Sequence, residues 1–350
     1  MTTIKDVAKK AGVSIAVVSK ALNNYPDVSP KTRQRILQVA EEMHYSPNLV
    51  AKNLSSKKQR TIGLITSGFS DSGGKDSNNS FKLFSGVYSG IGDNYELAIY
   101  LTDSLKQKKK SYAHFCRERN IGGAILMGIR MDDPYVHELL DTNIPCVLVD
   151  IVAEEQNKLI GSVTSDNRNA SQEITTYLLE KNHRDIVVVA GTKETYVNNE
   201  RLAGAKQAYS SLDFTLEKEQ VIYAQFSEEI AYEKVKSYLD STDTIPTAFL
   251  CFSDLMAYGA MQAVKDAGFR IPEDISITGF DDLIISEYTQ PPLTTMRQNF
   301  IDIGKQSSIL LQDLMENNQQ SNTVYVSSQF IERKSVQQLP NENKSKKYHK

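Results

Sequence analysis

Residues 1–45 repeat apolar positions with a helical period in three short segments. In the first segment the apolar positions are Ile4, Val7, Ala8 and Ala11, with Thr3 and Asp6 placed as a capping box and Gly12 as the stop. The second segment is expected to begin after Ser14. The third begins at Pro30 with Ser29 as its cap. Only two residues separate the first two segments, which is the spacing of a helix-turn-helix.

From residue 61 the pattern changes to short apolar, β-branched runs that alternate with helical stretches. The runs are TIGLIT, LAIYLT, GAILMG, PCVLVD, DIVVVAG, TAFLCF and ISITGF. The helical stretches cover 107–119, 169–181, 201–211, 228–240 and 254–267. This alternation predicts parallel sheets with helices on both faces. Because about 270 residues of it exceed what one sheet needs, we expect two lobes.

These changes of pattern predict four parts. Residues 1–45 form a helix-turn-helix domain, 46–60 a polar and basic linker, 61–338 a two-lobed α/β core, and 339–350 a disordered tail. Within the core we expect an N-lobe of residues 61–161 and 294–323 and a C-lobe of residues 162–293 and 324–338. The stretch SGFSDSGGKDSNNS, from Ser67, is either a mobile loop at the cleft mouth or an ordinary surface loop.

The charge is distributed unevenly along the chain. Residues 1–60 carry 11 Lys and Arg against 4 Asp and Glu, whereas the other 290 residues carry 29 against 39. A basic helical segment on an acidic body favours a polyanionic partner for the first part alone, although a solvated lysine-rich face is the alternative. No apolar run is long enough to span a membrane and the first residues lack an apolar leader, so we expect a cytoplasmic protein.

The residues that usually mark enzymes and metal sites are missing or scattered. No GxGxxG follows a predicted strand, and there is no P-loop and no GxSxG. The five histidines lack metal-ligand spacing, and Cys116, Cys146 and Cys251 are expected in the core. Asp281 and Asp282 are adjacent and point to different sides, so we expect one to contact ligand and one to be structural. The sequence therefore predicts no catalysis, no cofactor and no metal.

The second predicted helix has two chemically different faces. Its inward positions are Val18, Ala21 and Leu22, and its outward positions are Ile15, Ala16, Ser19, Lys20 and Asn23. Small residues near its start let a helix enter a DNA groove, where Lys20 and Asn23 supply donors. Ser14 and Thr32 are placed to position phosphates. The alternative is a helical bundle without a nucleic-acid partner.

The segments TIKDVAKKAGVSIAVVSKALNN and VSPKTRQRILQVAEEMHYSPNLVAKNL resemble the DNA-binding head of the LacI/GalR family of transcription regulators. The resemblance implies that Ser14 to Asn23 contains the recognition helix, with Ile15, Ala16 and Lys20 at base-reading positions. Residues nearer the DNA backbone would be Thr3, Ser19, Asn23, Ser29, Thr32 and Tyr45. It also implies DNA contacts by Asn48 and a hinge helix, NLVAKNL, whose Leu54 wedges into the minor groove. Lys20 stands where the family more often has Arg, and a single ammonium lacks the fork that Arg presents to guanine.

Polar residues follow several predicted strands of the core. They are Ser67, Asp150, Ser253, Asp254, Asp281 and Asp282. Each alone is more often a cap or turn residue. Ligands of parallel sheets bind at the carboxyl ends of the strands, and carboxylates there pair well with the vicinal hydroxyls of a sugar.

The motifs RLAG, SDLMAYGAM, AGFRIPEDISITGFDD and PPLTTMRQNF extend the resemblance to the family's core, which shares its fold with periplasmic sugar-binding proteins. It implies that Arg201 and Asp281 hold ligand hydroxyls. Ser67, Asp150 and Gln298 would complete the polar shell. Phe226 would be an apolar platform, and Ser253 stands where Asn is frequent.

Together these features predict a homodimeric repressor of carbohydrate-utilisation genes that binds palindromic double-stranded operator DNA and a small-molecule effector, a carbohydrate, between its lobes. Three alternatives stay open: a carbon-catabolite regulator controlled by a phosphoprotein, a purine-dependent repressor, and a sugar-binding or enzymatic α/β protein without a DNA role. The C-terminal region shows no heptad segment of the kind that assembles tetramers, so a dimer is favoured.

Overall fold

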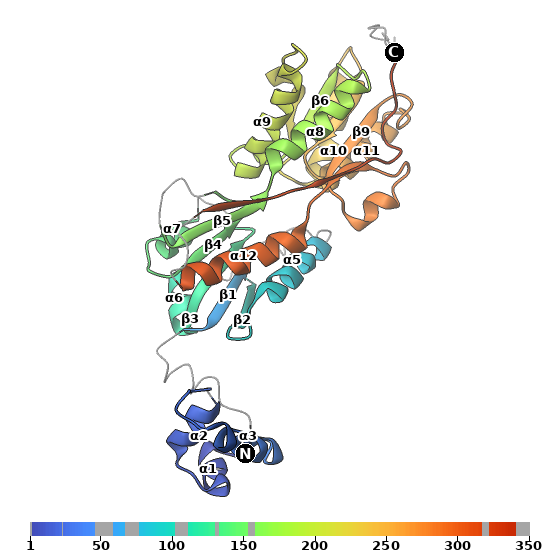
Figure 1. The fold of residues 1–350 in the computed structure, drawn as a ribbon. Coiled ribbons are helices and arrows are strands. Elements are labelled where there is room, and N and C mark those ends of the chain that lie inside the picture. Colours follow the sequence, from blue (N-terminus) through green and yellow to red (C-terminus); the bar gives the residue numbers. More distant parts are fainter. Residues whose placement is uncertain are drawn as a thin grey trace. The chain divides into compact units, whose positions relative to one another are not determined.

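The computed structural model describes residues 2–22, 24–45, 59–66, 77–101, 111–129, 133–152, 158–316 and 322–340. The chain divides into two compact units between Gln59 and Arg60. The first unit, the head, contains the first three helices, and the second, the body, contains two six-stranded sheets (Figure 1).

The head is a bundle of α1 (Ile4–Ala11), α2 (Ile15–Leu22) and α3 (Pro30–Glu42), each packed against the other two. The predicted local signals are confirmed. Thr3 and Asp6 form a capping box, and Gly12 ends α1 in the left-handed conformation at φ 66°. The Ser29 side chain caps α3, whose first residue is Pro30. The buried apolar residues are Val7, Ala8, Ala11, Val18, Ala21, Val28, Ile36 and Ala40.

The N-lobe of the body is a parallel sheet in the order β11-β5-β4-β3-β1-β2. Its strands are β1 (Thr61–Thr66), β2 (Glu96–Leu101), β3 (Ile121–Met127), β4 (Cys146–Val149), β5 (Ile160–Ser165) and β11 (Thr323–Val326). One core cluster joins the sheet to α5 (Ser77–Gly90) and α12 (Phe300–Met315). A second cluster joins it to α6 (Tyr112–Glu118) and α7 (Pro134–Leu140). Alternate strand residues therefore serve opposite faces, as expected for a sheet covered on both sides.

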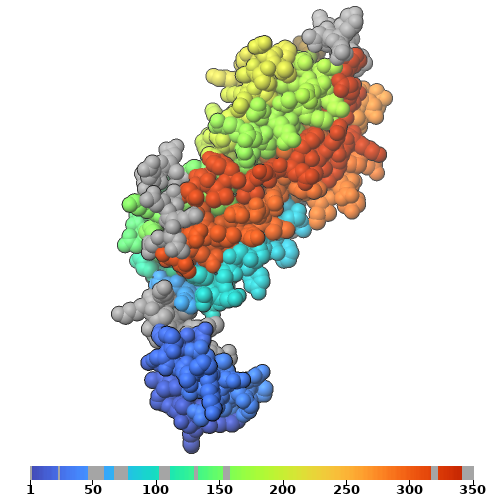
Figure 2. All heavy atoms as spheres, viewed as in Figure 1, coloured from blue at the N-terminus to red at the C-terminus, as the bar shows by residue number. Residues whose placement is uncertain are grey.

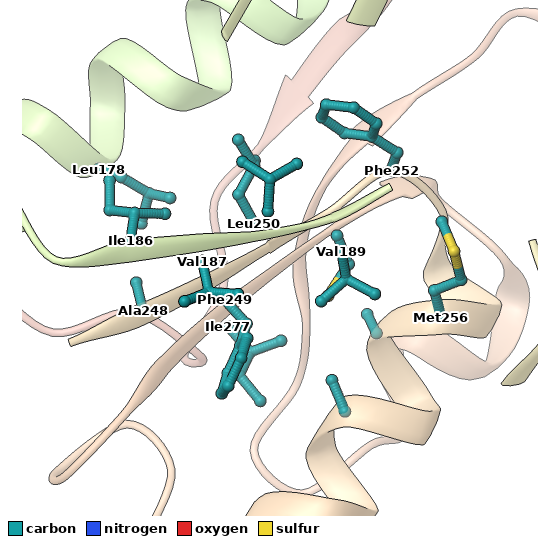
Figure 3. Close-up of a cluster of buried hydrophobic side chains, with 14 of the residues drawn as sticks. Leu178, Ile186, Val187, Val189, Ala248, Phe249, Leu250, Phe252, Met256 and Ile277 are labelled. Carbon is teal, nitrogen blue, oxygen red and sulfur yellow. The ribbon is translucent and has the colours of Figure 1, made fainter. Parts of the chain in front are cut away.

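The C-lobe sheet has the order β12-β10-β9-β8-β6-β7 and is parallel except for β12. Its strands are β6 (Ile186–Ala190), β7 (Val221–Tyr223), β8 (Ala248–Cys251), β9 (Ser276–Asp281), β10 (Thr294–Arg297) and β12 (Gln329–Ile331). Its helices are α8 (Asn167–Glu180), α9 (Tyr196–Ser210), α10 (Glu228–Ser241) and α11 (Asp254–Asp266), with short helices η1 (Lys218–Gln220) and η2 (Ile284–Glu287). In Figure 3, Leu178 and Ile186 lie on one side of this sheet, and Val187 and Phe249 lie on the other.

The chain passes between the lobes three times, after β5, after β10 and after β11. In Figure 2 the red atoms, which belong to α12 and to the chain after β11, extend over both lobes. The predicted lobe boundaries at 161, 293 and 323 fall a few residues too early. The cause is strand pairing: β5 and β11 remain paired in the N-lobe sheet to Ser165 and Val326, and β10 belongs wholly to the C-lobe sheet.

Several elements were not anticipated from the sequence. They are α5, α7, α12, β5, β7, β10, β11 and β12. Residues 77–80, expected in a loop, form the first turn of α5, whereas 67–76 lie outside the described residues. Leu339, expected in a disordered tail, is hydrogen-bonded to Lys181 and Asn182. The three cysteines are buried and free, as predicted. Among the described helices, none combines the length and apolar character that crossing a bilayer requires.

Candidate functional site

The exposed face of α2 includes three of the five residues that the sequence places outward. Ile15 keeps 43% of its surface exposed, and Ala16 and Lys20 are also exposed, whereas Ser19 is half-buried. Val18 and Ala21 point into the bundle core. The Ser14 hydroxyl accepts a hydrogen bond from the backbone N–H of Val17, 3.3 Å away, so it caps the helix. An exposed large apolar side chain beside a small one and a cation is a surface suited to a groove.

The residues assigned to the DNA backbone occupy different local settings. Ser29 and Thr32 lie together at the start of α3, their hydroxyls 2.9 Å apart, where helix N–H groups favour an anion. Thr3 is exposed and donates to Asp6 within the capping box. Tyr45 is half-buried against the head core, so its ring also has a packing role. Four predicted site residues, Asn23, Asn48, Leu54 and Ser67, lie outside the described residues.

In the body, a chain of buried polar groups connects the facing edges of the two lobes. Thr164, at the end of β5, donates to Asp150, 2.8 Å away, just after β4. The amide nitrogen of Asn167, in the first turn of α8, donates to Thr164 across 3.1 Å. The amide oxygen of Asn167 accepts from Nε of Arg201, 2.8 Å away. Asp150 of the N-lobe and Arg201 of the C-lobe therefore belong to one hydrogen-bonded series.

Arg201 is held rigidly in this series. Its side chain is 3% exposed, donates to the carbonyl oxygen of Phe252, and lies with its guanidinium carbon 3.6 Å from the ring centroid of Phe280. Its helix is pressed against α8, because a Cβ at Gly204 would lie 2.1 Å from the carbonyl oxygen of Arg168. Only glycine permits that approach, so α8 and α9 fix Asn167 and Arg201 relative to each other.

A second polar chain passes through the interlobe segment after β10. Ser165 donates to Oε1 of Gln298, 2.5 Å away, and Nε2 of Gln298 donates to Asp281 across 2.5 Å. Ser165 ends β5 in the N-lobe and Asp281 ends β9 in the C-lobe. The predicted residues Asp281 and Gln298 are therefore in direct contact. A change in the separation of the lobes must break or rearrange this series.

The charges of the cluster influence one another. Burial raises the pKa of the Asp150 carboxyl, while Thr164 and the guanidinium of Arg201 oppose the rise. Burial lowers the pKa of Arg201, and the carboxylates of Asp281, Asp150 and Asp254 oppose the fall. Clusters of buried groups with perturbed pKa values are a feature of functional sites.

The backbone is also unusual at three of the predicted ligand residues. The φ angles of Asp150, Phe226 and Asp281 are 60°, 58° and 123°. Residues other than glycine adopt such angles at a cost, and strain of this kind recurs at ligand and active sites. Other residues of this chain with positive φ, such as Asn120 and Asn182, lie in turns that end helices.

The remaining predicted residues occupy different local settings. Phe226 lies directly over Gly191 at the carboxyl end of β6, since a Cβ there would lie 2.1 Å from its ring, so an apolar ring is present at the edge where parallel sheets bind ligands. Ser253 caps α11 by accepting from the N–H of Met256. Asp282 forms ion pairs with Arg297 and Arg333 at 2.7 Å. Asp282 therefore has the structural role expected of one of the two carboxylates, and the ligand role of Asp281 stays a prediction.

Sequence reasoning missed Thr164, Ser165 and Asn167, which hold the predicted residues in place. The sequence feature that could have indicated them is the short run IGSVTS, which forms β5 and is followed by Asp166, the N-cap of α8. Asp254 is fully buried and accepts from the Leu283 N–H and from two hydroxyls, so its role is structural.

A cavity of about 680 Å³ elsewhere in the body contains none of the predicted ligand residues. It lies between the first turn of α5, through Asn78, and α11 with the segment 283–290. Ile284, Ile285 and Tyr288 on its wall are exposed apolar side chains. The buried charges converge at Arg201 and Asp281 instead, away from this cavity.

Comparison with known proteins gives consistent matches to both units. Residues 3–48 match the family described as bacterial regulatory proteins, lacI family, and residues 175–336 match a periplasmic binding protein-like domain. The chain is 31% identical to the probable HTH-type transcriptional repressor ExuR of Bacillus subtilis, over 97% of this chain and 99% of that one. It is 30% identical to the HTH-type transcriptional repressor PurR of Vibrio vulnificus, over 97% and 100%.

Solved structures agree with this result. The lac repressor dimer bound to operator and the anti-inducer ONPF superposes with a TM-score of 0.78 at 26% identity, covering 96% of this chain and 99% of that one. The transcriptional regulator CelR in complex with cellobiose has a TM-score of 0.72 at 23% identity, covering 96% and 100%. The second likeness concerns the fold alone.

Proposed function

Because this chain belongs to the LacI family of bacterial regulatory proteins, we propose that it represses carbohydrate-utilisation genes and that a sugar or sugar phosphate bound between its lobes controls its operator affinity. The membership itself makes the chain a DNA-binding transcriptional repressor with a helix-turn-helix head, acting as a homodimer on an operator. Since a repressor acts where the chromosome lies, the proposal also places it in the cytoplasm.

The observation that carries the proposal is the pair of polar chains that join the lobes through Asp150, Arg201, Gln298 and Asp281. Carboxylates accept and guanidinium groups donate, so the cluster offers both kinds of partner that sugar hydroxyls need. A ligand that inserts into these chains alters contacts between lobes. Such a ligand binds one lobe arrangement better than another, which is all that control of the head requires.

In the head, we propose that α2 enters the major groove with Ile15, Ala16 and Lys20 toward the bases. Ser14, Ser19, Ser29 and Thr32 would contact phosphates, and Asn23, Asn48 and Leu54, outside the described residues, would complete the DNA contacts. Two heads on two half-sites give specificity that one small bundle lacks, because linked binding raises the effective concentration of the second head.

Two other kinds of control remain candidates. A purine corepressor is supported by relatives that are named PurR, such as the repressor of Vibrio vulnificus. A phosphoprotein partner would act at the outer surface and would leave the Arg201 and Asp281 cluster unused. The direction of the effect, induction or corepression, follows from which lobe arrangement the ligand prefers.

We place the second copy of the dimer against apolar side chains that the body exposes. The C-lobe exposes Ile284, Ile285 and Tyr288, and the N-lobe exposes Phe81 and Tyr88 on α5. A body without a partner would leave these side chains in water, and apolar surface of this kind commonly marks a protein interface.

A thermal-shift screen of the full-length chain tests the ligand class. We expect sugars or sugar phosphates to raise the melting temperature of the body, because a ligand at about 100 times its dissociation constant stabilises by about 2.7 kcal/mol. Purines serve as the comparison set. A shift with purines alone would replace the carbohydrate proposal by corepression, and silence of every small molecule would favour the phosphoprotein.

A further inference from the structure

Lys20 is paired with a carboxylate on the exposed face of the head. Its ammonium donates to Oδ2 of Asp27, which lies in the turn between α2 and α3. The side chains are 48% and 51% exposed. Asp27 raises the pKa of Lys20, and Lys20 lowers that of Asp27, chiefly through this hydrogen bond, so both groups stay charged at neutral pH.

Stability does not account for this pair. Ion pairs between solvent-exposed side chains contribute little, because water and salt screen them. A carboxylate on a DNA-binding surface is moreover repelled by phosphates, which dominate the affinity of such surfaces. Asp27 therefore weakens general attraction to DNA, and its position beside Lys20 calls for a role in recognition.

The chemistry of the pair matches one base-pair edge. In the major groove a G·C pair presents the acceptors N7 and O6 of guanine beside the N4 amino donor of cytosine. An ammonium only donates and a carboxylate only accepts. In an A·T pair the N6 donor separates the acceptors N7 and O4, so an ammonium engages one of them alone.

We propose that Lys20 and Asp27 together recognise one G·C pair in each half-site, with Lys20 on guanine and Asp27 on the cytosine amino group. The inference rests on the proposed placement of α2 in the major groove. It explains how a lysine serves where the family more often has arginine: the neighbouring carboxylate supplies the second contact that a lone ammonium lacks.

The test uses the full-length chain and a palindromic operator that the wild-type protein selects from a random half-site library. Fluorescence anisotropy at one salt concentration then measures affinity for this duplex and for duplexes with each half-site base pair changed in turn. The variants are Lys20→Met, Asp27→Ala and the matched control Glu41→Ala, which removes an exposed carboxylate from α3. Asp27→Asn keeps an acceptor oxygen and serves as a second variant.

We expect the wild-type chain to discriminate against loss of one G·C pair by about fivefold or more, the range of a specific base contact. Lys20→Met and Asp27→Ala should both lose discrimination at that pair and keep it elsewhere, with Asp27→Asn intermediate. Glu41→Ala should leave the whole profile unchanged. Asp27→Ala also removes a negative charge, so its affinity for unrelated DNA should rise.

Three results separate the inference from its premise. If Asp27→Ala keeps the wild-type profile while Lys20→Met loses one position, the paired contact is wrong and the placement of α2 stands. If the position lost by Lys20→Met is an A·T pair, the assignment of the base pair is wrong. If Lys20→Met leaves every position unchanged, the placement of Lys20 in the groove fails as well.

Discussion

Ala16→Glu is expected to abolish specific operator binding, with a loss of about 100-fold or more in affinity. Ala16 is exposed in the first turn of α2, where a glutamate is compatible with the helix because acidic side chains favour helix N-termini. The head should therefore stay folded while a bulky anion blocks entry into the groove. Anisotropy with a selected operator measures the loss, and circular dichroism checks the fold.

Gln38→Glu is the matched control for this variant. Gln38 is also exposed and helical, but it lies in the second half of α3, and its substitution adds the same single negative charge. We expect it to lower affinity only about twofold to threefold, through long-range repulsion that salt screens. Equal losses from the two variants would show that charge alone matters and would remove α2 from the groove.

Asp281→Asn is expected to weaken effector binding by about 10-fold to 100-fold while operator binding without effector is retained. The substitution removes the single negative charge that faces Arg201 and that accepts a hydrogen bond from Gln298. Hydrogen bonds to charged groups contribute about 1.5–3 kcal/mol. Asparagine nearly matches aspartate in size and shape, so the substitution changes the charge with little change in packing. Calorimetry with the ligand that gives the largest thermal shift measures the effect.

Asp274→Asn is the matched control. It makes the same charge change just before the first residue of β9, whereas Asp281 is the last residue of that strand. Asp274 accepts hydrogen bonds from Arg270, so this variant controls for loss of a carboxylate in the same lobe. We expect its ligand affinity to equal that of the wild-type chain. An Asp281→Asn variant that also binds normally would exclude Asp281 from the ligand site.

The head was predictable because its determinants are local. Thr3, Asp6, Gly12, Ser29 and Pro30 each act on backbone groups within a few residues, and the structure has every one of them in its predicted role. The faces of α2 also followed from period alone, since Val18 and Ala21 are buried and Ala16 and Lys20 exposed. The Lys20 and Asp27 pair did not follow, because it depends on how the turn after α2 folds back.

The body was predictable in class but not in detail. Alternation identified most central strands, yet β5 was missed because IGSVTS is short and half polar, although its residues are all buried. Missing β5 meant missing Asn167, which connects Asp150 to Arg201 through Thr164. The order of the sheets and the three interlobe passages arise from pairing between residues far apart in sequence, which no local pattern records.

Coupling between ligand and operator tests the central claim most directly. The wild-type full-length chain is titrated onto its selected operator without ligand and with the ligand from the thermal-shift screen at saturation. We predict a change in operator affinity of about 5-fold to 150-fold, equal to a coupling free energy of about 1–3 kcal/mol. A ligand that stabilises the body and leaves operator affinity unchanged would contradict an effector-controlled repressor.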